Sequence, residues 1–132
     1  MTRSFFEGDC YSLAIVGKAL TDNSLNIDEI RVGGGGSKFD FWVQMLADVL
    51  NCPLKRSTSK ESTLLGNAML AYVNAGDFKN FKEAEQSLGR PLQEFTPNTK
   101  ANAEYQEMFE FYQKLYYTLS DLYKEHALMK KY

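Results

Sequence analysis

Four consecutive glycines, Gly33 to Gly36, follow a β-branched apolar run and precede an amphipathic segment. Four adjacent glycines lose more backbone entropy on folding than any other four residues. A flexible linker would use such a run, but these glycines are tightly flanked on both sides and too few to separate two domains. The run therefore predicts a tight turn between a strand and a helix, and it favours an α/β fold.

Hydrophobic periodicity and turn residues predict the other elements. A first helix is expected from residue 3 to about residue 21, and the run from Ile27 to Val32 predicts a short strand. Ser37 is a favourable N-cap, so the helix after the glycines is expected to begin there and to continue through residue 50. The later expectations are a short strand or extended piece at 53–57, a helix at 61–75 stopped by Gly76, a short helix at 81–88, an extended segment at 90–98 and a long helix from about 99 to about 129.

The composition is that of an ordinary globular domain. The chain has 132 residues, 44% of them hydrophobic, and a formal net charge of -2. These values allow one domain with a hydrophobic core and do not indicate a nucleic-acid surface. No apolar run approaches the roughly 20 residues of a membrane span, and the first residues do not form a signal peptide. We therefore expect a cytoplasmic protein without nucleic-acid or membrane partners.

Residues that could carry covalent or metal chemistry are sparse. Cys10 and Cys52 lack the spacing of a metal or redox motif, so two reduced, half-buried thiols are expected. The single histidine, His126, argues against a zinc site and against a Ser/His/Asp triad. No catalytic residue and no metal site is predicted in this chain.

The glycine turn has the features of a phosphate-binding site. Glycines allow positive φ and let successive N–H groups point at one oxyanion, and the following helix N-terminus adds unpaired N–H groups. Lys38 adds a positive charge. The P-loop pattern fails because Ser37 precedes this lysine, and GxGxxG fails because its last glycine would fall on Lys38 or Phe39. The turn is predicted to hold a phosphate or nucleotide in neither standard way; the alternative is a sharp turn that serves packing only.

Two other features have both a packing and a binding interpretation. Gly66 and Ala68 are small enough for their helix to approach another backbone or a flat ring closely, and packing is the commoner reason. The aromatic stripe of the last helix could stack on a ligand. At helical spacing such a stripe is more often core or domain interface.

Three stretches carry a recognisable series of motifs. They are "FFEGDCYSLAIVGKAL" with its early Glu-Gly, "IRVGGGGSKFDFWVQMLADVLNCPLK" with Trp-x-Gln-x-x-Ala-Asp after the glycines, and "ESTLLGNAMLAYVNAGDF" with Glu-x-x-x-Leu-Gly-x-Ala. In this order they resemble the C-terminal portion of the FGGY family of carbohydrate kinases. The tail "FTPNTKANAEYQEMFEFYQKLY" resembles the closing helix of that family. The resemblance implies an α/β fold, part of an actin-like (ribonuclease H-like) ATPase domain, helix-rich with a long C-terminal helix.

The resemblance also implies a division of the site. Residues 1–132 would be the C-terminal portion of the nucleotide-binding domain, and the N-terminal sugar-binding domain with its catalytic aspartate would lie outside this chain. ATP and Mg²⁺ are the implied cofactors. Asp48 and Glu61 match family positions and are interpreted as structural, while Gly66 and Ala68 would let their helix pack close to the nucleotide cleft. The residues expected along the nucleotide are Gly34, Gly35, Gly36, Ser37, Lys38 and Asp40.

The implied activity of the parent protein is transfer of the ATP γ-phosphoryl group to a carbohydrate hydroxyl, with xylulose or a related pentulose as the expected acceptor. The resemblance covers only the C-terminal part of such a kinase, without the sugar-binding domain, so we expect the chain to be inactive alone. Because such a piece exposes apolar surface, we also expect a homo-oligomer. The alternative is a stand-alone nucleotide-binding or structural interaction module without catalysis.

Overall fold

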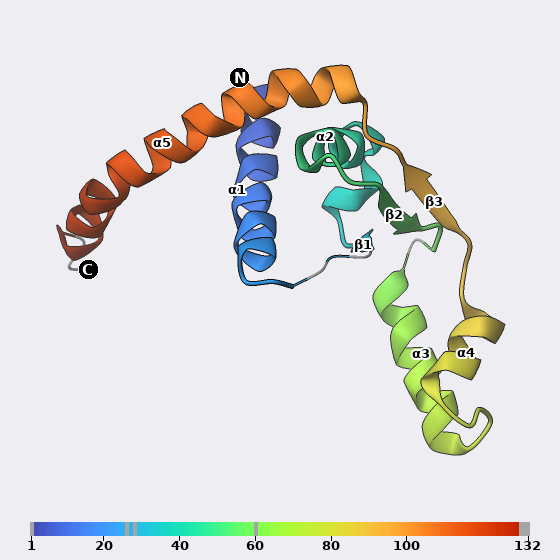
Figure 1. Cartoon of the computed structure of the whole chain (residues 1–132). Helices are drawn as coiled ribbons and strands as arrows, with labels where there is room; N and C mark the ends of the chain where they lie inside the picture. The colour runs from blue at the N-terminus through green and yellow to red at the C-terminus, as the bar shows by residue number, and fades with distance from the viewer. Residues whose placement is uncertain (1, 26, 28, 60, 130–132) are drawn as a thin grey trace.

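The computed structural model describes residues 2–25, 27, 29–59 and 61–129 (Figure 1). The predicted order of helices and strands is confirmed. The part of the predicted strand that pairs is shorter than expected, and positions 26 and 28 lie outside the described residues. The elements are α1 (Thr2–Asp22), β1 (Ile30–Val32), the 3₁₀ turn η1 (Gly36–Lys38), α2 (Asp40–Leu50), β2 (Leu54–Ser57), α3 (Ser62–Ala75), α4 (Phe81–Leu88), β3 (Leu92–Phe95) and α5 (Thr99–Met129).

The three strands form one small mixed sheet in the order β1-β2-β3. β1 and β2 run parallel, with Ile30 opposite Leu54, and α2 makes the crossover that parallel strands require. β3 returns antiparallel to β2, with Phe95 opposite Leu54. β1 therefore pairs on one side only within the described residues.

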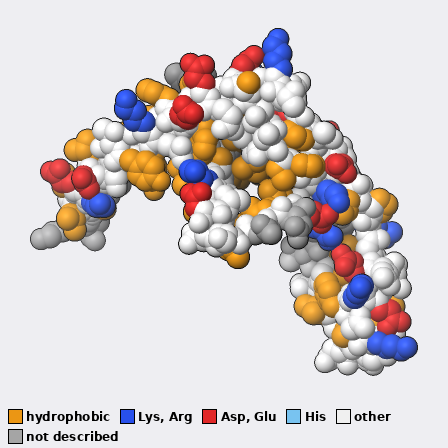
Figure 2. All heavy atoms as spheres, viewed as in Figure 1, with side chains coloured by type: hydrophobic (Ala, Val, Ile, Leu, Met, Phe, Trp, Pro, Cys, Tyr) orange, Lys and Arg blue, Asp and Glu red, His pale blue; other side chains and the backbone are white. Residues whose placement is uncertain are grey.

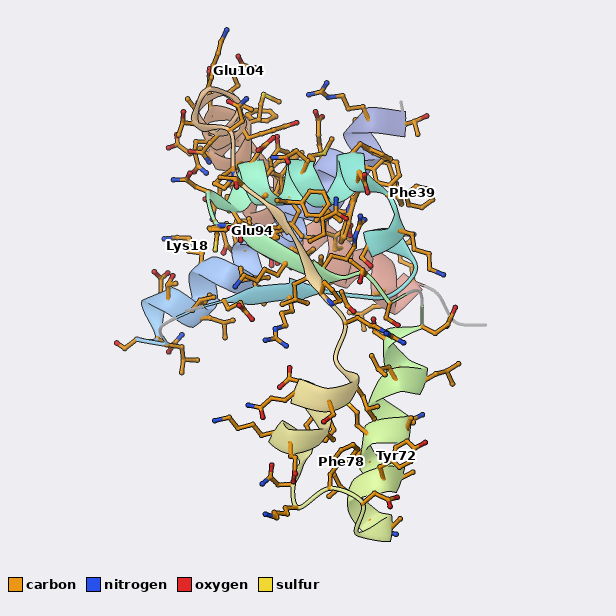
Figure 3. All side chains as sticks on the ribbon, turned by 90° about the vertical axis from the view of Figure 1, so that its right-hand side faces the viewer. Lys18, Phe39, Tyr72, Phe78, Glu94 and Glu104 are labelled. Atoms are coloured by element: carbon orange, nitrogen blue, oxygen red, sulfur yellow. The ribbon has the colours of Figure 1, made fainter. Side chains whose placement is uncertain are left out.

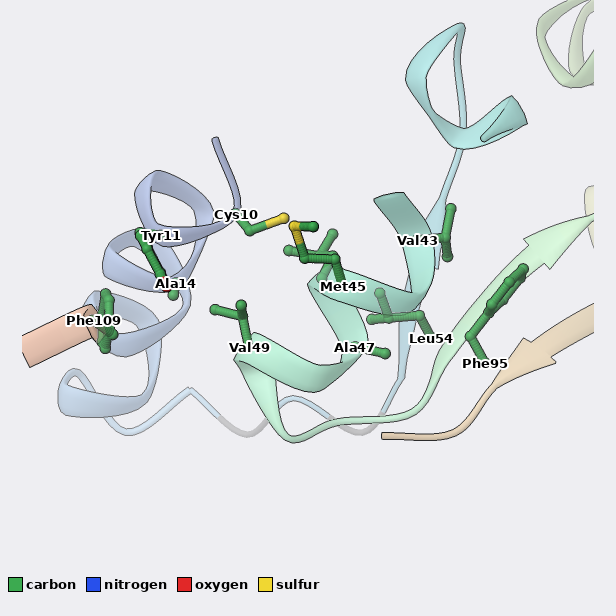
Figure 4. Close-up of a cluster of buried hydrophobic side chains, with 11 residues drawn as sticks. Cys10, Tyr11, Ala14, Val43, Met45, Ala47, Val49, Leu54, Phe95 and Phe109 are labelled. Carbon is green, nitrogen blue, oxygen red and sulfur yellow. The ribbon is translucent and has the colours of Figure 1, made fainter. Parts of the chain in front are cut away.

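The hydrophobic core lies where α2 meets α1, α5 and the sheet (Figure 4). α2 is the central element because it contacts all three, and most of its residues are buried. Figure 1 shows α5 crossing over α1 and α2, with its C-terminal half extending beyond them. The buried cluster is Cys10, Tyr11, Ala14, Val43, Met45, Leu46, Ala47, Val49, Leu54, Phe95 and Phe109.

The cysteines differ in burial. Both carry free thiols, as expected. Cys10 is fully buried rather than half-buried, because α1 turns it into the core against α2. Cys52 has intermediate burial in the loop after α2.

The start of α2 corrects the sequence prediction. Ser37 is not the N-cap: α2 begins at Asp40, and Phe39 stands at the cap position without a side-chain hydrogen bond. The residues directly after the glycines form η1 instead, closed by the Lys38 N–H donating to the Gly35 carbonyl at 3.2 Å. This 3₁₀ turn takes up the segment in which the α-helix was expected to start.

α3 and α4 lie side by side, apart from the helices of the core (Figure 1). The rings of Tyr72 and Phe78 meet edge to face at a centroid distance of 6.0 Å, as Figure 3 shows. α3 ends at Gly76 with φ of 88°, as the sequence predicted. None of the described helices is both long and apolar enough to cross a membrane.

An apolar hollow of about 840 Å³ opens between α1 and the unpaired side of β1. Leu13 and Val16 of α1, Ile30 of β1 and Leu46 of α2 contribute to its walls. Figure 2 shows hydrophobic side chains gathered in this middle part of the molecule and along α5.

Candidate nucleotide-binding site

The backbone requires only one of the four glycines. Gly34 has φ of +87°, a conformation in which an L side chain is strained. A Cβ placed on Gly33 or Gly35 would meet no described atom within 4 Å, and one on Gly36 would make an ordinary contact of 3.9 Å with the ring of Trp42. The backbone conformation therefore explains one glycine, and open space lies beside Gly33 and Gly35.

A polar hollow of about 660 Å³ lies beside Gly34 and Gly35. Gly34 and Gly35 form one wall, and their N–H groups donate to no backbone carbonyl in the part of the chain that the structure describes. The end of β2, the loop after it and the first turn of α3 also line the hollow, with side chains that can donate hydrogen bonds to an anion. These are Ser57, Thr58, Ser59, Ser62 and Thr63.

The side chains of the turn do not fill this hollow. The Ser37 hydroxyl donates to the Gly34 carbonyl at 2.8 Å, so this side chain stabilises the turn itself. Lys38 and Glu61 face each other across the hollow with 4.0 Å between Nζ and Oε1, and both are mostly exposed, at 60% and 66%. An exposed pair of this kind contributes little to stability, so the Lys38 ammonium can turn to an anionic ligand.

A second hollow of about 620 Å³ continues from the first between α3, α4 and the sheet. Both are bordered by Val32, Ser57 and Ser62. Its walls are more apolar than those of the first hollow. They include Leu65, Gly66, Met69, Phe81 and Leu92.

Gly66 corrects a packing expectation. A Cβ at this position would meet no described atom within 4 Å, so Gly66 does not let α3 pack closely against any described element. It faces the second hollow instead. A small residue on a helix usually serves close packing, so packing was the prediction from the sequence. What a helix face contacts depends on the tertiary structure, which the sequence pattern does not contain.

Four of the predicted nucleotide residues line the polar hollow together: Gly34, Gly35, Ser37 and Lys38. The other two, Gly36 and Asp40, are not among the described residues that line it. Gly36 backs onto Trp42, whose indole N–H donates to Asp9 at 2.9 Å. The carboxylate of Asp40 is bound by Arg56 at 2.7 Å.

Arg56, near the end of β2, also lines the polar hollow, and no sequence pattern had predicted it as a site residue. Its side chain is only 15% exposed, and its guanidinium lies 4.9 Å from the centroid of the Phe95 ring. No local pattern marks this residue, because its partners come from η1, α2 and β3, which lie 16 to 39 positions away.

Asp48 has contacts that agree with its structural interpretation. Its carboxylate accepts from the Gln44 side chain at 2.9 Å and from the Asn98 N–H at 2.8 Å. The carbonyl of Asp48 accepts from Asn102 at 2.7 Å. These bonds join α2 to the start of α5. Glu61, in contrast, precedes α3 without capping it through its side chain.

The part of the chain that forms this site matches a known protein family. The family model described as "FGGY family of carbohydrate kinases, C-terminal domain" matches residues 1–75, which include the glycine turn and the whole of α3. The chain belongs to the FGGY family of carbohydrate kinases. Most of the walls of both hollows come from this matched part.

Individual FGGY kinases match most of the chain. The L-xylulose/3-keto-L-gulonate kinase of Escherichia coli is 30% identical over 131 residues, which are 97% of this chain and 26% of that protein. The crystal structure of ligand-bound xylulose kinase from Lactobacillus acidophilus matches with a TM-score of 0.82 and 27% identity, over 96% of this chain and 26% of that one. Plasmodium falciparum glycerol kinase with ADP matches with a TM-score of 0.67 and 25% identity, over 89% of this chain and 24% of that one.

These likenesses confirm the expected family and the expected actin-like (ribonuclease H-like) ATPase fold. The chain spans about a quarter of the length of the FGGY kinases that it matches.

Proposed function

We propose that this chain is the C-terminal portion of the nucleotide-binding domain of an ATP-dependent sugar kinase. The observation that carries the proposal is the open space beside Gly35, where the fold needs no glycine and a polar hollow is bordered by the N–H groups of Gly34 and Gly35, which donate to no backbone carbonyl of the described residues. A polyphosphate is the ligand that such a turn suits, because main-chain N–H groups and a lysine can all face its oxygens.

The two hollows together fit the two halves of a nucleotide. The phosphates would lie against Gly34 and Gly35, with Lys38 and the hydroxyl side chains between the end of β2 and the start of α3 around them. The adenosine would lie in the second hollow, where Gly66 leaves room for a flat ring and Met69 and Leu65 offer apolar contact. ADP in the related glycerol kinase structure supports a nucleotide in this family.

The described residues contain no group of three acidic, histidine or cysteine side chains that could hold a metal ion. Mg²⁺ bound with ATP usually takes one or two carboxylates and completes its shell with phosphate oxygens and water. The set of residues present therefore fits a Mg²⁺ ion that arrives on the nucleotide, rather than one held in a protein cage.

Phosphoryl transfer depends mainly on positioning and charge stabilisation. ATP supplies the phosphoryl group; the residues of this chain hold its phosphates in one orientation and place positive charge beside them. The parent protein would supply the acceptor sugar site and the base for its hydroxyl. The names of the related kinases favour xylulose or a similar pentulose as the acceptor.

The rest of the nucleotide-binding domain has a place to pack. β1 is unpaired on one side within the described residues, and the apolar hollow of about 840 Å³ lies next to that side. Burying both would satisfy the strand edge and remove apolar surface from water.

Titration with ADP tests the proposal through the single tryptophan, Trp42, which lies against the glycine turn. We expect a saturable change in fluorescence with ADP and ATP, and a calorimetric heat that saturates at the same concentrations. Failure of ADP, ATP and pyrophosphate to bind at millimolar concentration would refute it. With ATP and xylulose present, the chain alone is expected to release no sugar phosphate, and turnover by the pure chain would contradict the division of the site.

A further inference from the structure

We propose that Arg56 is the positioning residue of the glycine turn: it holds the peptide groups that follow the Gly34 and Gly35 N–H groups, and so fixes the turn that presents these two groups to the phosphates. This inference rests on the proposed function. The family resemblance did not point to this residue, and only the contacts of its guanidinium reveal the role.

The guanidinium joins three separate segments. Nη1 donates to the Ser37 carbonyl in η1. Nη2 donates to the Asp40 carboxylate at 2.7 Å and to the Gln93 side-chain oxygen at 2.6 Å. The Phe95 ring lies against the guanidinium, at 4.9 Å from its centroid. A planar group with several donors in a fixed fork can make these contacts at once, whereas a lysine ammonium cannot reproduce them.

The bond to Ser37 sets the orientation of the turn. In a trans peptide the carbonyl and the following N–H point in opposite directions, so holding the Ser37 carbonyl also aims the Lys38 N–H. That N–H donates to the Gly35 carbonyl at 3.2 Å, which in turn fixes the peptide between Gly35 and Gly36. One guanidinium therefore controls two peptide planes of the turn.

The same contacts make the hollow more favourable for an anion. A phosphate-binding turn must present N–H groups, and Arg56 keeps the Ser37 carbonyl occupied. Asp40 carries a negative charge close to the turn, and its side chain is 70% exposed. The arginine pairs with that carboxylate and so offsets its negative charge beside the hollow. An exposed carboxylate makes this pair a weak source of stability, so its main effect is on orientation and local charge.

The test compares Arg56→Lys and Arg56→Met with wild type, and uses Lys55→Met as the matched control. Lys55 is the neighbour on β2, and its ammonium pairs with Glu29 rather than with the turn. Both Arg56 variants are expected to bind ADP and pyrophosphate about tenfold more weakly, because an orienting charged hydrogen bond is lost. Binding of adenosine should stay unchanged. A general loss of structure would weaken adenosine and ADP together.

A second measurement needs no ligand. Hydrogen exchange at the hydrogen-bonded amides of the turn, those of Lys38 and Phe39, should become faster in both Arg56 variants and stay unchanged in Lys55→Met, with the amides of α1 and α2 protected in all of them. The inference is overturned if these amides exchange as in wild type, or if the Arg56 variants bind ADP and pyrophosphate as tightly as wild type does. Failure of wild type to bind ADP would instead refute the proposed function, and the exchange result would still decide the role of Arg56.

Discussion

The contrast between Gly35→Ala and Gly34→Ala separates a turn made for a ligand from a turn made for the fold. Gly35 has φ of -62° and ψ of -44°, which any L residue adopts, and an added Cβ would meet no described atom within 4 Å. Gly34 has φ of +87°. The two substitutions each add one methyl group at adjacent positions. The backbone at Gly35 accepts a side chain without strain, and the backbone at Gly34 does not.

Their effects on stability should have opposite signs. Gly35→Ala lowers the entropy of the unfolded chain and should raise the free energy of unfolding by about 0.4–1 kcal/mol. Gly34→Ala should lower it by about 1–2 kcal/mol, because a left-handed conformation is strained for alanine. For a chain of this size, 1 kcal/mol corresponds to roughly 4 °C in the midpoint of thermal unfolding followed by circular dichroism.

Their effects on binding should have the same sign. The alanine methyl at position 35 would stand in the polar hollow, so ADP affinity measured by calorimetry should fall at least tenfold although the protein is as stable as wild type or more so. If Gly35→Ala binds ADP as tightly as wild type, the phosphates do not lie against this wall and the reasoning fails. If it destabilises the chain, the backbone of the turn differs from the one described.

Three other predictions concern the rest of the molecule. Asp48→Ala leaves the Asn98 N–H without its acceptor and should lower the free energy of unfolding in urea by about 2 kcal/mol, while the exposed Asp121→Ala should not change it. Burial raises the pKa of Cys10 from 9.0 to about 12, so the thiol ionises at lower pH in the unfolded chain than in the folded one. The contribution of Cys10 to the free energy of unfolding is therefore fully present below pH 9. Between pH 9 and pH 12 the free energy of unfolding should fall by up to about 1.4 kcal/mol per pH unit. Cys10→Ala should flatten this dependence, and Cys52→Ala should leave it; equal slopes would contradict the assignment. The exposed apolar side chains of α5, Phe111 and Leu122 among them, should make the chain self-associate, and a monomer in concentrated samples by light scattering would count against this.

Parts of the site were predictable because they are local. Gly34, Gly35, Ser37 and Lys38 are consecutive or nearly so, and placing a glycine turn between a strand and a helix is enough to bring them to one hollow. Gly36 and Asp40 are equally close in sequence, yet Gly36 backs onto Trp42 and Asp40 pairs with Arg56. Proximity along the chain does not say which way a residue faces once a 3₁₀ turn has changed the phase of the helix.

The sequence by itself determined the order of helices and strands, the turn at the glycines and the family. These follow from periodicity, turn residues and short motifs, all of which act over a few neighbouring positions. The tertiary structure alone decided that Gly66 faces a hollow and that Arg56 holds the turn, because each depends on which elements meet across the sheet. Contacts between residues distant in the chain arise from packing, and no local pattern carries that information.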